Sequence, residues 1–253
     1  MLRQSIVLLS RRPSLFGTGA SEISSTCTNV YSPSITQHGQ FSTLTATKKP
    51  LRLMPVGGSV TYGVGSSDGN GYRQFLGDML RADGYQVQFV GSRRSGSMTN
   101  GDNEGWRGYR IDQIDSKVRK CVSTLAPQVF TVNAGSNDCV QDFRMEALGL
   151  RMENMLEFLW QANPASVIIL STLLVNRDKD INSRVMDAND QFRKLTELKA
   201  REGKKIVLAD MNNSRGPQLD DLVDGTHPDD YGYKKMAAIW FNAIRRAREK
   251  GFL

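Results

Sequence analysis

The stretch Leu51-Arg-Leu-Met-Pro-Val-Gly-Gly-Ser-Val-Thr-Tyr-Gly63 passes from an apolar run into a glycine-rich turn that carries one serine. The run over residues 51–56 predicts a buried strand, and the glycines predict a sharp turn directly after it. A turn of this kind can expose the Ser59 hydroxyl above the end of a sheet. A lone serine in a turn is more often a turn or helix-capping residue. Ser59 is therefore a candidate nucleophile that needs support from elsewhere in the chain.

Three well-known strand-to-turn signatures do not fit this stretch. The pentapeptide G-x-S-x-G is absent because Thr61 occupies the position of its last glycine. No Gly-Lys-Ser/Thr follows the strand, which excludes a Walker loop. Gly63, Gly65, Gly69 and Gly71 do not have the spacing of a dinucleotide fingerprint. The sequence does not predict a nucleotide site.

Four further apolar runs follow, and they predict strands near residues 86–91, 128–134, 166–172 and 205–209. The segments between these runs have helical periodicity, most clearly at residues 148–159 and 233–247, and we expect those stripes to be core faces. Strands that alternate with helices predict a parallel sheet with helices on both faces. The length suits one such α/β domain.

The segment Asp224-Gly-Thr-His227-Pro228 places a carboxylate three residues before the only histidine outside the first fifty residues. Histidine is suited to proton transfer near neutral pH, and a carboxylate at its far nitrogen would fix its tautomer. The same residues could also form an ordinary helix start with Pro228 at the first helical position. On this segment alone the helix start is the more economical interpretation.

Two more segments complete a pattern: residues 104–114, which contain Gly108, and Val132-Asn-Ala-Gly-Ser-Asn137-Asp138. With these, the chain resembles the SGNH (GDSL-like) hydrolases, whose four sequence blocks occur here in the family's order. The resemblance covers residues 53–233 and is closest to carbohydrate acetylesterases of the acetylxylan esterase type, through residues 53–71, 89–96 and 108–114. It implies the SGNH hydrolase fold, a three-layer αβα sandwich around a flavodoxin-like, five-stranded parallel sheet, within residues 49–253.

The resemblance also implies roles for individual residues. Ser59 would attack an ester carbonyl, His227 would take and return the proton, and Asp224 would orient the imidazole. The oxyanion hole would comprise the Ser59 and Gly108 backbone N–H groups and the Asn137 side-chain amide. Each candidate follows a predicted strand at its carboxyl end, with Gly108 beyond the run at 86–91, so one sheet edge could hold them all. The alternatives are that Gly108 is only a turn residue and Asn137 only a helix cap.

The sequence departs from the family pattern at two places. Gly58 stands where the family usually has the aspartate of G-D-S, which adds backbone freedom to the Ser59 turn. Trp106 and Arg107 directly precede Gly108, where small residues are more usual. Both are weak candidates for substrate binding, because an aromatic ring and a guanidinium suit a sugar face or an anionic group. Packing of Trp106 in the core is the alternative.

Residues 1–48 differ in composition from the rest of the chain. The first fifty residues hold nine serines, seven threonines and five basic residues, but Glu22 is their only acid. This composition is typical of a mitochondrial transit peptide. A secretory signal is less well supported, because Arg11 and Arg12 interrupt a short apolar stretch, and a disordered tail is a further alternative. We expect a targeting or disordered segment, followed by the hydrolase domain at residues 49–253.

Composition limits the choice of partners and cofactors. The chain has 33 basic and 26 acidic residues; without the five basic residues and one acid of the first fifty, 28 and 25 remain, a net charge of +3. This mild charge argues against nucleic acid, and no apolar run is long enough for an integral membrane segment. Cys27, Cys121 and Cys139 form no C-x-x-C, and two histidines do not suffice for a metal site, so no metal or cofactor is expected. Cys121 and Cys139 could pair in an oxidising compartment.

The sequence therefore predicts a metal-independent serine esterase that acts on a small-molecule or carbohydrate ester, with an acetyl ester of a sugar as the favoured substrate. One alternative is a lipase- or thioesterase-like hydrolase of other acyl esters. The other is a non-catalytic carbohydrate-binding relative, in which Gly58 and Trp106 mark a site without turnover. The oligomeric state is not predicted.

Overall fold

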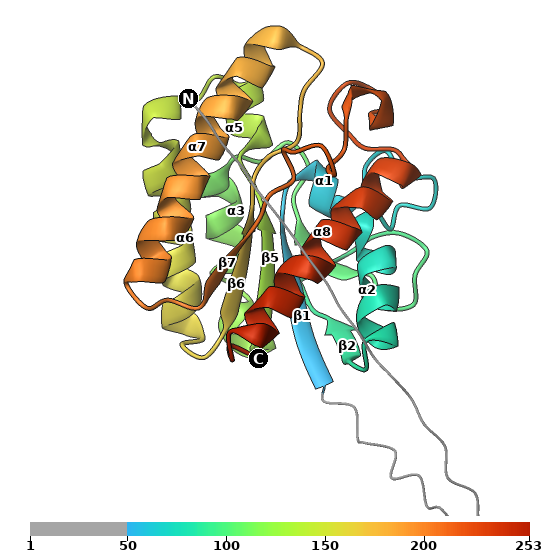
Figure 1. Ribbon diagram of the computed structural model, residues 1–253, viewed down its shortest axis with the longest axis vertical. Coiled ribbons are helices and arrows are strands. Elements are labelled where there is room, and N and C mark those ends of the chain that lie inside the picture. Colours follow the sequence, from blue (N-terminus) through green and yellow to red (C-terminus); the bar gives the residue numbers. More distant parts are fainter. Residues whose placement is uncertain (1–49) are drawn as a thin grey trace, which may run out of the picture. The chain divides into compact units, whose positions relative to one another are not determined.

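The computed structural model describes residues 50–253, which form a central sheet with helices on both faces (Figure 1). Within this range the sheet has seven strands. They are β1 (Pro50–Gly57), β2 (Gln86–Phe89), β3 (Arg93–Arg94), β4 (Asp102–Gly105), β5 (Val129–Asn133), β6 (Val167–Ser171) and β7 (Ile206–Ala209). The fold class predicted from the sequence is confirmed.

The five predicted strands are present and run parallel in the order β2-β1-β5-β6-β7, which is the flavodoxin-like order. Strands β3 and β4 were not predicted, so the expected number of strands was too low. β2 pairs with residues 50–53 of β1, and β4 pairs in parallel with residues 56–57 further along the same strand. β3 adds to β4 in the antiparallel direction. The segment from β2 to β4 therefore extends the sheet beside the last residues of β1.

Helices fill both layers around the sheet. They are α1 (Ser59–Tyr62), α2 (Tyr72–Ala82), α3 (Ile111–Val118), α4 (Val122–Leu125), α5 (Ser136–Val140), α6 (Leu148–Ala162), α7 (Lys179–Arg201) and α8 (Asp230–Glu249), with 3-10 turns η1 (Met145–Ala147) and η2 (Leu219–Asp221). The expected stripes at residues 148–159 and 233–247 are the buried faces of α6 and α8. The prediction that they are core faces is confirmed.

Alternation along β1 divides the core into two halves. Met54 and Val56 pack with the side chains of α3, α6 and α7, whereas Leu51 and Leu53 pack with those of α2 and α8. This is the period of two that a strand requires when both of its faces are buried. The rigid sheet thus holds its carboxyl edge between two packed helical layers.

Arg73 of α2 is fully buried and ties together the loops near this edge. Its guanidinium donates hydrogen bonds to the carbonyl oxygens of Tyr62, Gly69, Ser95 and Gly101 at 2.7–3.2 Å. No carboxylate accepts from it within the described residues. A buried guanidinium that is satisfied by backbone carbonyls fixes several loops through one side chain.

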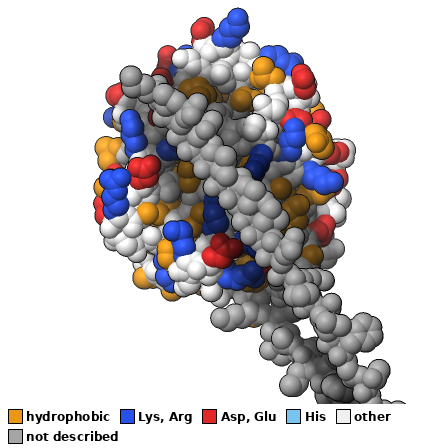
Figure 2. Space-filling view, viewed as in Figure 1, with side chains coloured by type: hydrophobic (Ala, Val, Ile, Leu, Met, Phe, Trp, Pro, Cys, Tyr) orange, Lys and Arg blue, Asp and Glu red, His pale blue; other side chains and the backbone are white. Residues whose placement is uncertain are grey.

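Charged side chains are mixed on the face shown in Figure 2, where acidic and basic groups lie interspersed. Within residues 50–253 no helix is sufficiently long and apolar to cross a bilayer. The predicted targeting segment at residues 1–48, and Cys27 within it, lie outside the described residues. Cys121 and Cys139 are unpaired thiols, and burial raises the pKa of each to about 12.

Candidate active site

Ser59 is the first residue of α1, immediately after β1 ends at Gly57. The chain passes so close to β5 here that a Cβ on Gly57 would lie 2.1 Å from the Asn133 carbonyl oxygen. Only glycine fits that approach. The one-turn helix α1 ends at Gly63, whose φ of 100° is in the left-handed region. Packing and turn chemistry together hold the Ser59 hydroxyl above the sheet edge.

The His227 ring lies between Ser59 and Asp224. Its Nε2 is 2.7 Å from Ser59 Oγ, and its Nδ1 is 2.6 Å from Asp224 Oδ2. Asp224 Oδ1 accepts hydrogen bonds from the backbone N–H groups of Thr226 at 3.0 Å and His227 at 2.8 Å. Each carboxylate oxygen therefore has its own donors. The result is a continuous chain of hydrogen bonds from the carboxylate to the serine hydroxyl.

The Asp224–His227 turn is a separate feature from the helix that follows. Val223 N donates to the His227 carbonyl oxygen at 2.9 Å, which closes the turn. Helix α8 begins at Asp230, and Asp229 caps it by accepting from Gly232 N at 2.7 Å. The alternative that placed Pro228 at the first helical position was wrong, because Pro228 precedes the cap.

Hydrogen bonding controls the charge state of Asp224. Burial by itself would raise the pKa of this carboxyl, but the His227 ring, the two backbone N–H groups and the charge on His227 outweigh it and lower the pKa to about 2. Hydrogen bonds to an ionised carboxylate stabilise that form. Asp224 is consequently a carboxylate throughout the neutral and mildly acidic range, available as an acceptor for Nδ1–H.

Gly108, on the loop after β4, and Asn137, in the first turn of α5, lie beside Ser59. Gly108 has a φ of +78°, a conformation that favours glycine, although a Cβ there would meet nothing within 4 Å. Asn137 Nδ2 donates to the Tyr109 carbonyl oxygen at 3.0 Å. Asn137 is inside α5, whose cap is Gly135, so the interpretation of Asn137 as a cap was wrong. One amide hydrogen of Asn137 thus holds the Gly108 loop and leaves the second free.

Gly108 follows β4 rather than β2, which corrects the expectation that it lies beyond the strand at 86–91. Trp106 N donates to the Gly57 carbonyl oxygen at 2.8 Å, so the β4 chain continues beside the end of β1. Tyr109 N then donates to the Trp106 carbonyl oxygen at 3.2 Å and closes the turn around Gly108. The unpredicted strand β4 is what carries Gly108 to the serine.

Ser59, Gly108, Asn137 and His227 line one surface depression of about 450 Å³, here called the Ser59 depression. Its lining consists of Ser59, Val64, Arg107, Gly108, Ser136, Asn137, Val140, Thr226 and His227. Arg107 is exposed and belongs to this lining, whereas Trp106 does not. The Trp106 indole N–H donates to buried Glu104 at 2.9 Å, and its ring lies 5.5 Å from that of Tyr109. Trp106 is therefore a packed side chain beneath the Gly108 loop.

Because Gly58 has no side chain, the Asn137 amide has space beside the Ser59 turn. A Cβ at position 58 would lie 3.3 Å from Asn137 Nδ2 and 3.9 Å from the Trp106 carbonyl oxygen. The first of these distances is tighter than an ordinary van der Waals contact. A side chain at position 58 would therefore meet the Asn137 amide, with no His227 atom within 4 Å of its Cβ.

Asp138 was not predicted as a site residue, but its hydrogen bonds connect the segments that carry Gly108 and Asn137. It is fully buried, its Oδ2 accepts from Ile111 N at 3.1 Å, and Arg151 forms an ion pair with Oδ1. Burial raises the pKa of this carboxyl, and Arg151 opposes that effect. Asp138 adjoins Asn137 and holds the start of α3, three residues after Gly108. Asp138 is the last residue of the segment Val132–Asp138 that carried the resemblance, and this was the sequence signal available for it.

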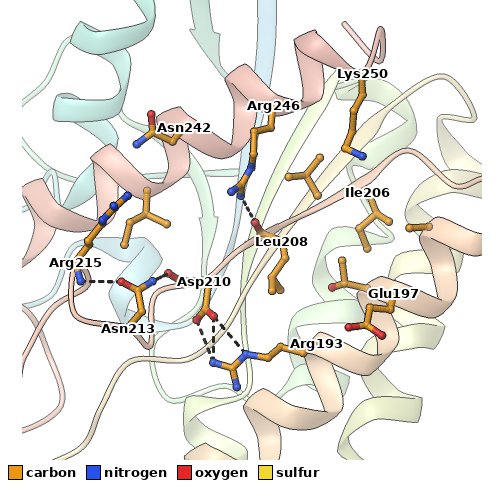
Figure 3. Close-up of a pocket in the computed structure, with 14 residues that line it drawn as sticks. Arg193, Glu197, Ile206, Leu208, Asp210, Asn213, Arg215, Asn242, Arg246 and Lys250 are labelled. Carbon is orange, nitrogen blue, oxygen red and sulfur yellow. Dashed lines mark hydrogen bonds and ion pairs between the residues drawn. The ribbon is translucent and has the colours of Figure 1, made fainter. Parts of the chain in front are cut away.

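A second groove of about 490 Å³ runs along β7 between α7 and α8 (Figure 3). Its lining contains no serine, cysteine or histidine, and its Asp210 carboxylate is paired with Arg193. Within residues 50–253, no three His, Cys, Asp or Glu side chains gather as ligands for a metal ion. At the Ser59 depression, by contrast, a serine and a histidine of the lining are hydrogen-bonded in series with the carboxylate of Asp224.

Comparison with known proteins agrees with this geometry. The profile of the GDSL-like Lipase/Acylhydrolase family matches residues 56–235. The chain belongs to this family. The matched range of the GDSL-like hydrolase includes every residue of the Ser59 depression.

Relatives of this GDSL-like hydrolase include carbohydrate esterases. A multidomain esterase of Ruminococcus flavefaciens is 25% identical over 223 residues, which is 77% of this chain but only 28% of that protein. The structure of a family 3 carbohydrate esterase of Clostridium thermocellum matches with a TM-score of 0.71 and 26% identity, covering 79% of this chain and 98% of the other. A family 3 carbohydrate esterase of Talaromyces cellulolyticus shares the fold with a TM-score of 0.68 at 19% identity, over 79% and 99% of the two chains.

Proposed function

We propose that the protein is a serine esterase that hydrolyses small acyl esters with Ser59, His227 and Asp224. The observation that carries the proposal is the chain of hydrogen bonds from Asp224 through His227 to Ser59. His227 Nε2 takes the proton from Ser59 Oγ as Oγ attacks the carbonyl carbon, and later donates it to the leaving alcohol. Water then attacks the acyl-enzyme with the same base, which releases the acid and restores the serine.

The oxyanion of each tetrahedral intermediate would bind to the backbone N–H groups of Ser59 and Gly108 and to Asn137 Nδ2. Two features support this arrangement. All three residues line the Ser59 depression, and the bond from Asn137 to Tyr109 holds the amide in place before substrate arrives. Donors that are fixed in advance need no reorganisation as charge develops on the oxygen.

An acetyl ester on a carbohydrate is the substrate class that we propose. The similarity to the carbohydrate esterase of Clostridium thermocellum and to the multidomain esterase supports it. Val64 and Val140 are the only apolar side chains larger than a methyl group in the lining of the Ser59 depression, and so small an apolar surface suits a short acyl chain better than a long one.

Hydrolysis of 4-nitrophenyl acetate and 4-nitrophenyl octanoate by the full chain tests the proposal, alongside Ser59→Ala and His227→Ala. We expect acetate turnover that both substitutions abolish, and Ser136→Ala serves as the control because it removes a second hydroxyl from the same depression. Preference for octanoate would instead favour a lipase- or thioesterase-like enzyme. A folded protein with no activity above the Ser59→Ala background would favour the binding-only alternative.

A further inference from the structure

We propose that the ester substrate carries a carboxylate a few bonds from its reacting carbonyl, and that Arg107 binds this carboxylate. The inference rests on the proposed esterase function and specifies its substrate. Arg107 is exposed and lines the Ser59 depression together with Ser59 and His227. Apart from His227, it is the only ionisable side chain in that lining. An anionic group bound near Ser59 would therefore meet a single dedicated cation.

The Arg107 guanidinium has no partner of its own in the described part of the chain. It forms no ion pair or hydrogen bond there, and its one aromatic neighbour is the Tyr62 ring, 6.0 Å from the centroid. Arg110, which lies three residues further on, is by contrast paired with Asp112 and bonded to Gln141. An arginine left unpaired beside a nucleophile is available to a ligand.

Two further cations lie near Arg107, on the side of the depression away from the carboxylate of Asp224, which is bonded to His227. Arg93 lies over the Trp106 ring at 4.4 Å, and Lys117 lies over the same ring at 4.8 Å. Glu104 is the acid beneath them, but it is fully buried and its oxygens accept from Ser92 N, the Trp106 indole and Cys121 Sγ. These internal donors therefore satisfy the Glu104 carboxylate. Cations on this side would attract an anionic substrate toward Ser59.

Hydrogen bonds hold the backbone around Arg107, whereas its guanidinium has no such partner among the described residues. The Trp106 and Tyr109 backbone bonds hold the turn on both sides, and the next residue is Gly108, a proposed oxyanion donor. Because Arg107 adjoins Gly108 and its side chain is long, the guanidinium is placed to meet groups several bonds from the reacting carbonyl rather than the carbonyl itself. A planar guanidinium can grip a carboxylate through two parallel hydrogen bonds, which gives orientation as well as attraction.

The test compares an anionic ester with a neutral analogue of the same shape. 4-Acetoxybenzoate places a carboxylate on the alcohol part, and methyl 4-acetoxybenzoate is its uncharged counterpart; mono-4-nitrophenyl succinate places the carboxylate on the acyl part. For wild-type protein and Arg107→Gln, kcat and KM are measured on all three esters. We expect Arg107→Gln to lower kcat/KM about tenfold for one anionic ester, mainly through KM, and to change the neutral ester less than about threefold. The ester that responds identifies which part of the substrate carries the carboxylate.

Two controls make the result specific. Arg107→Lys keeps the charge but not the paired donors, so it should restore part of the anionic preference. Arg215→Gln removes an exposed arginine from the β7 groove (Figure 3), which shares no lining residue with the Ser59 depression, and should leave the preference unchanged. Equal effects of Arg107→Gln on all three esters, or none, would overturn the inference while Ser59-dependent hydrolysis still stands. Hydrolysis that Ser59→Ala does not reduce would overturn the esterase proposal and this inference together.

Discussion

Substitution of Asp224 by asparagine should hold His227 in the wrong tautomer, because the two carboxylate oxygens of Asp224 have different partners. Oδ1 accepts from two backbone N–H groups, whereas Oδ2 faces His227 Nδ1 at 2.6 Å. In the variant the amide oxygen should keep the two backbone donors, because an amide NH₂ group cannot accept them. The NH₂ group is then turned toward Nδ1, and Nδ1 must act as an acceptor.

That arrangement puts the ring proton of His227 on Nε2, the atom that faces Ser59. An Nε2–H cannot remove the serine proton, so the base is held in the wrong tautomer. We expect kcat to fall about 10⁴-fold, which is about 5.5 kcal/mol in the activation barrier. The Asp224→Asn protein should nevertheless fold, because the backbone bonds that close the turn remain.

The assay is steady-state hydrolysis of 4-nitrophenyl acetate, with urea unfolding run in parallel to verify the fold. Asp224→Ala is the comparison, since it removes the carboxylate without imposing a tautomer. We expect Asp224→Asn to be no more active than Asp224→Ala. Retention of more than about a tenth of the wild-type kcat, a barrier change below about 1.4 kcal/mol, would refute this reasoning.

Three other outcomes follow from the structure. Asn137→Ala should lower kcat about 10²- to 10³-fold with little change in KM, as steady-state kinetics would reveal, and a fall confined to KM would contradict an oxyanion role. Arg73→Met should lower the free energy of unfolding by about 2–5 kcal/mol in urea titrations, because buried carbonyl oxygens lose their donor. Arg81→Met, on the exposed face of the same helix, should lower it by less than about 1 kcal/mol. Equal losses in the two variants would argue against the bracing role of Arg73. The pKa of Asp224 is about 2, below the unfolded value of about 3.9, so its ionised form stabilises the fold above about pH 4 and this contribution is lost as the pH falls to about 2. The stability difference between wild type and Asp224→Asn should therefore be constant at neutral pH and shrink in acid, and a difference that grows in acid would reverse the assigned sign.

The strands and helices that were predictable are those with a strong local pattern. The five predicted strands correspond to β1, β2, β5, β6 and β7. β5 and β6 are buried throughout, so their continuous apolar composition was a clear signal, whereas in β2 only Phe89 is buried. The stripes of α6 and α8 were equally clear because one side of each helix is continuously apolar.

Strands β3 and β4 carried no such pattern. Residues 93–94 are two arginines, and β4 consists of Asp102, Asn103, Glu104 and Gly105. Polar composition of this kind predicts a loop. Long-range contacts make it a strand, because Asn103 and Glu104 are buried against hydrogen-bond donors and acceptors from other segments. The position of Gly108 was misjudged for the same reason.

The order of the motifs predicted the site residues, but it did not predict the buried residues that brace the loops around them. The structure does bring Ser59, Asp224 and His227 into one chain of hydrogen bonds, as the motif spacing suggested. Arg73 and Asp138, which brace the surrounding loops, are buried polar residues with partners far away in the sequence. Nothing local distinguishes Arg73 from an exposed arginine, and the segment that contains Asp138 does not reveal its partner Arg151.

Covalent labelling tests the central claim most directly. The full chain is treated with a serine-directed phosphonate, and the adduct is mapped by peptide mass spectrometry in wild type, Ser59→Ala, His227→Ala and Ser136→Ala. We expect one adduct on Ser59, absent in Ser59→Ala, strongly slowed in His227→Ala and unchanged in Ser136→Ala. No adduct in folded wild-type protein, or labelling that is independent of His227, would contradict the assignment of Ser59 as a nucleophile activated by His227.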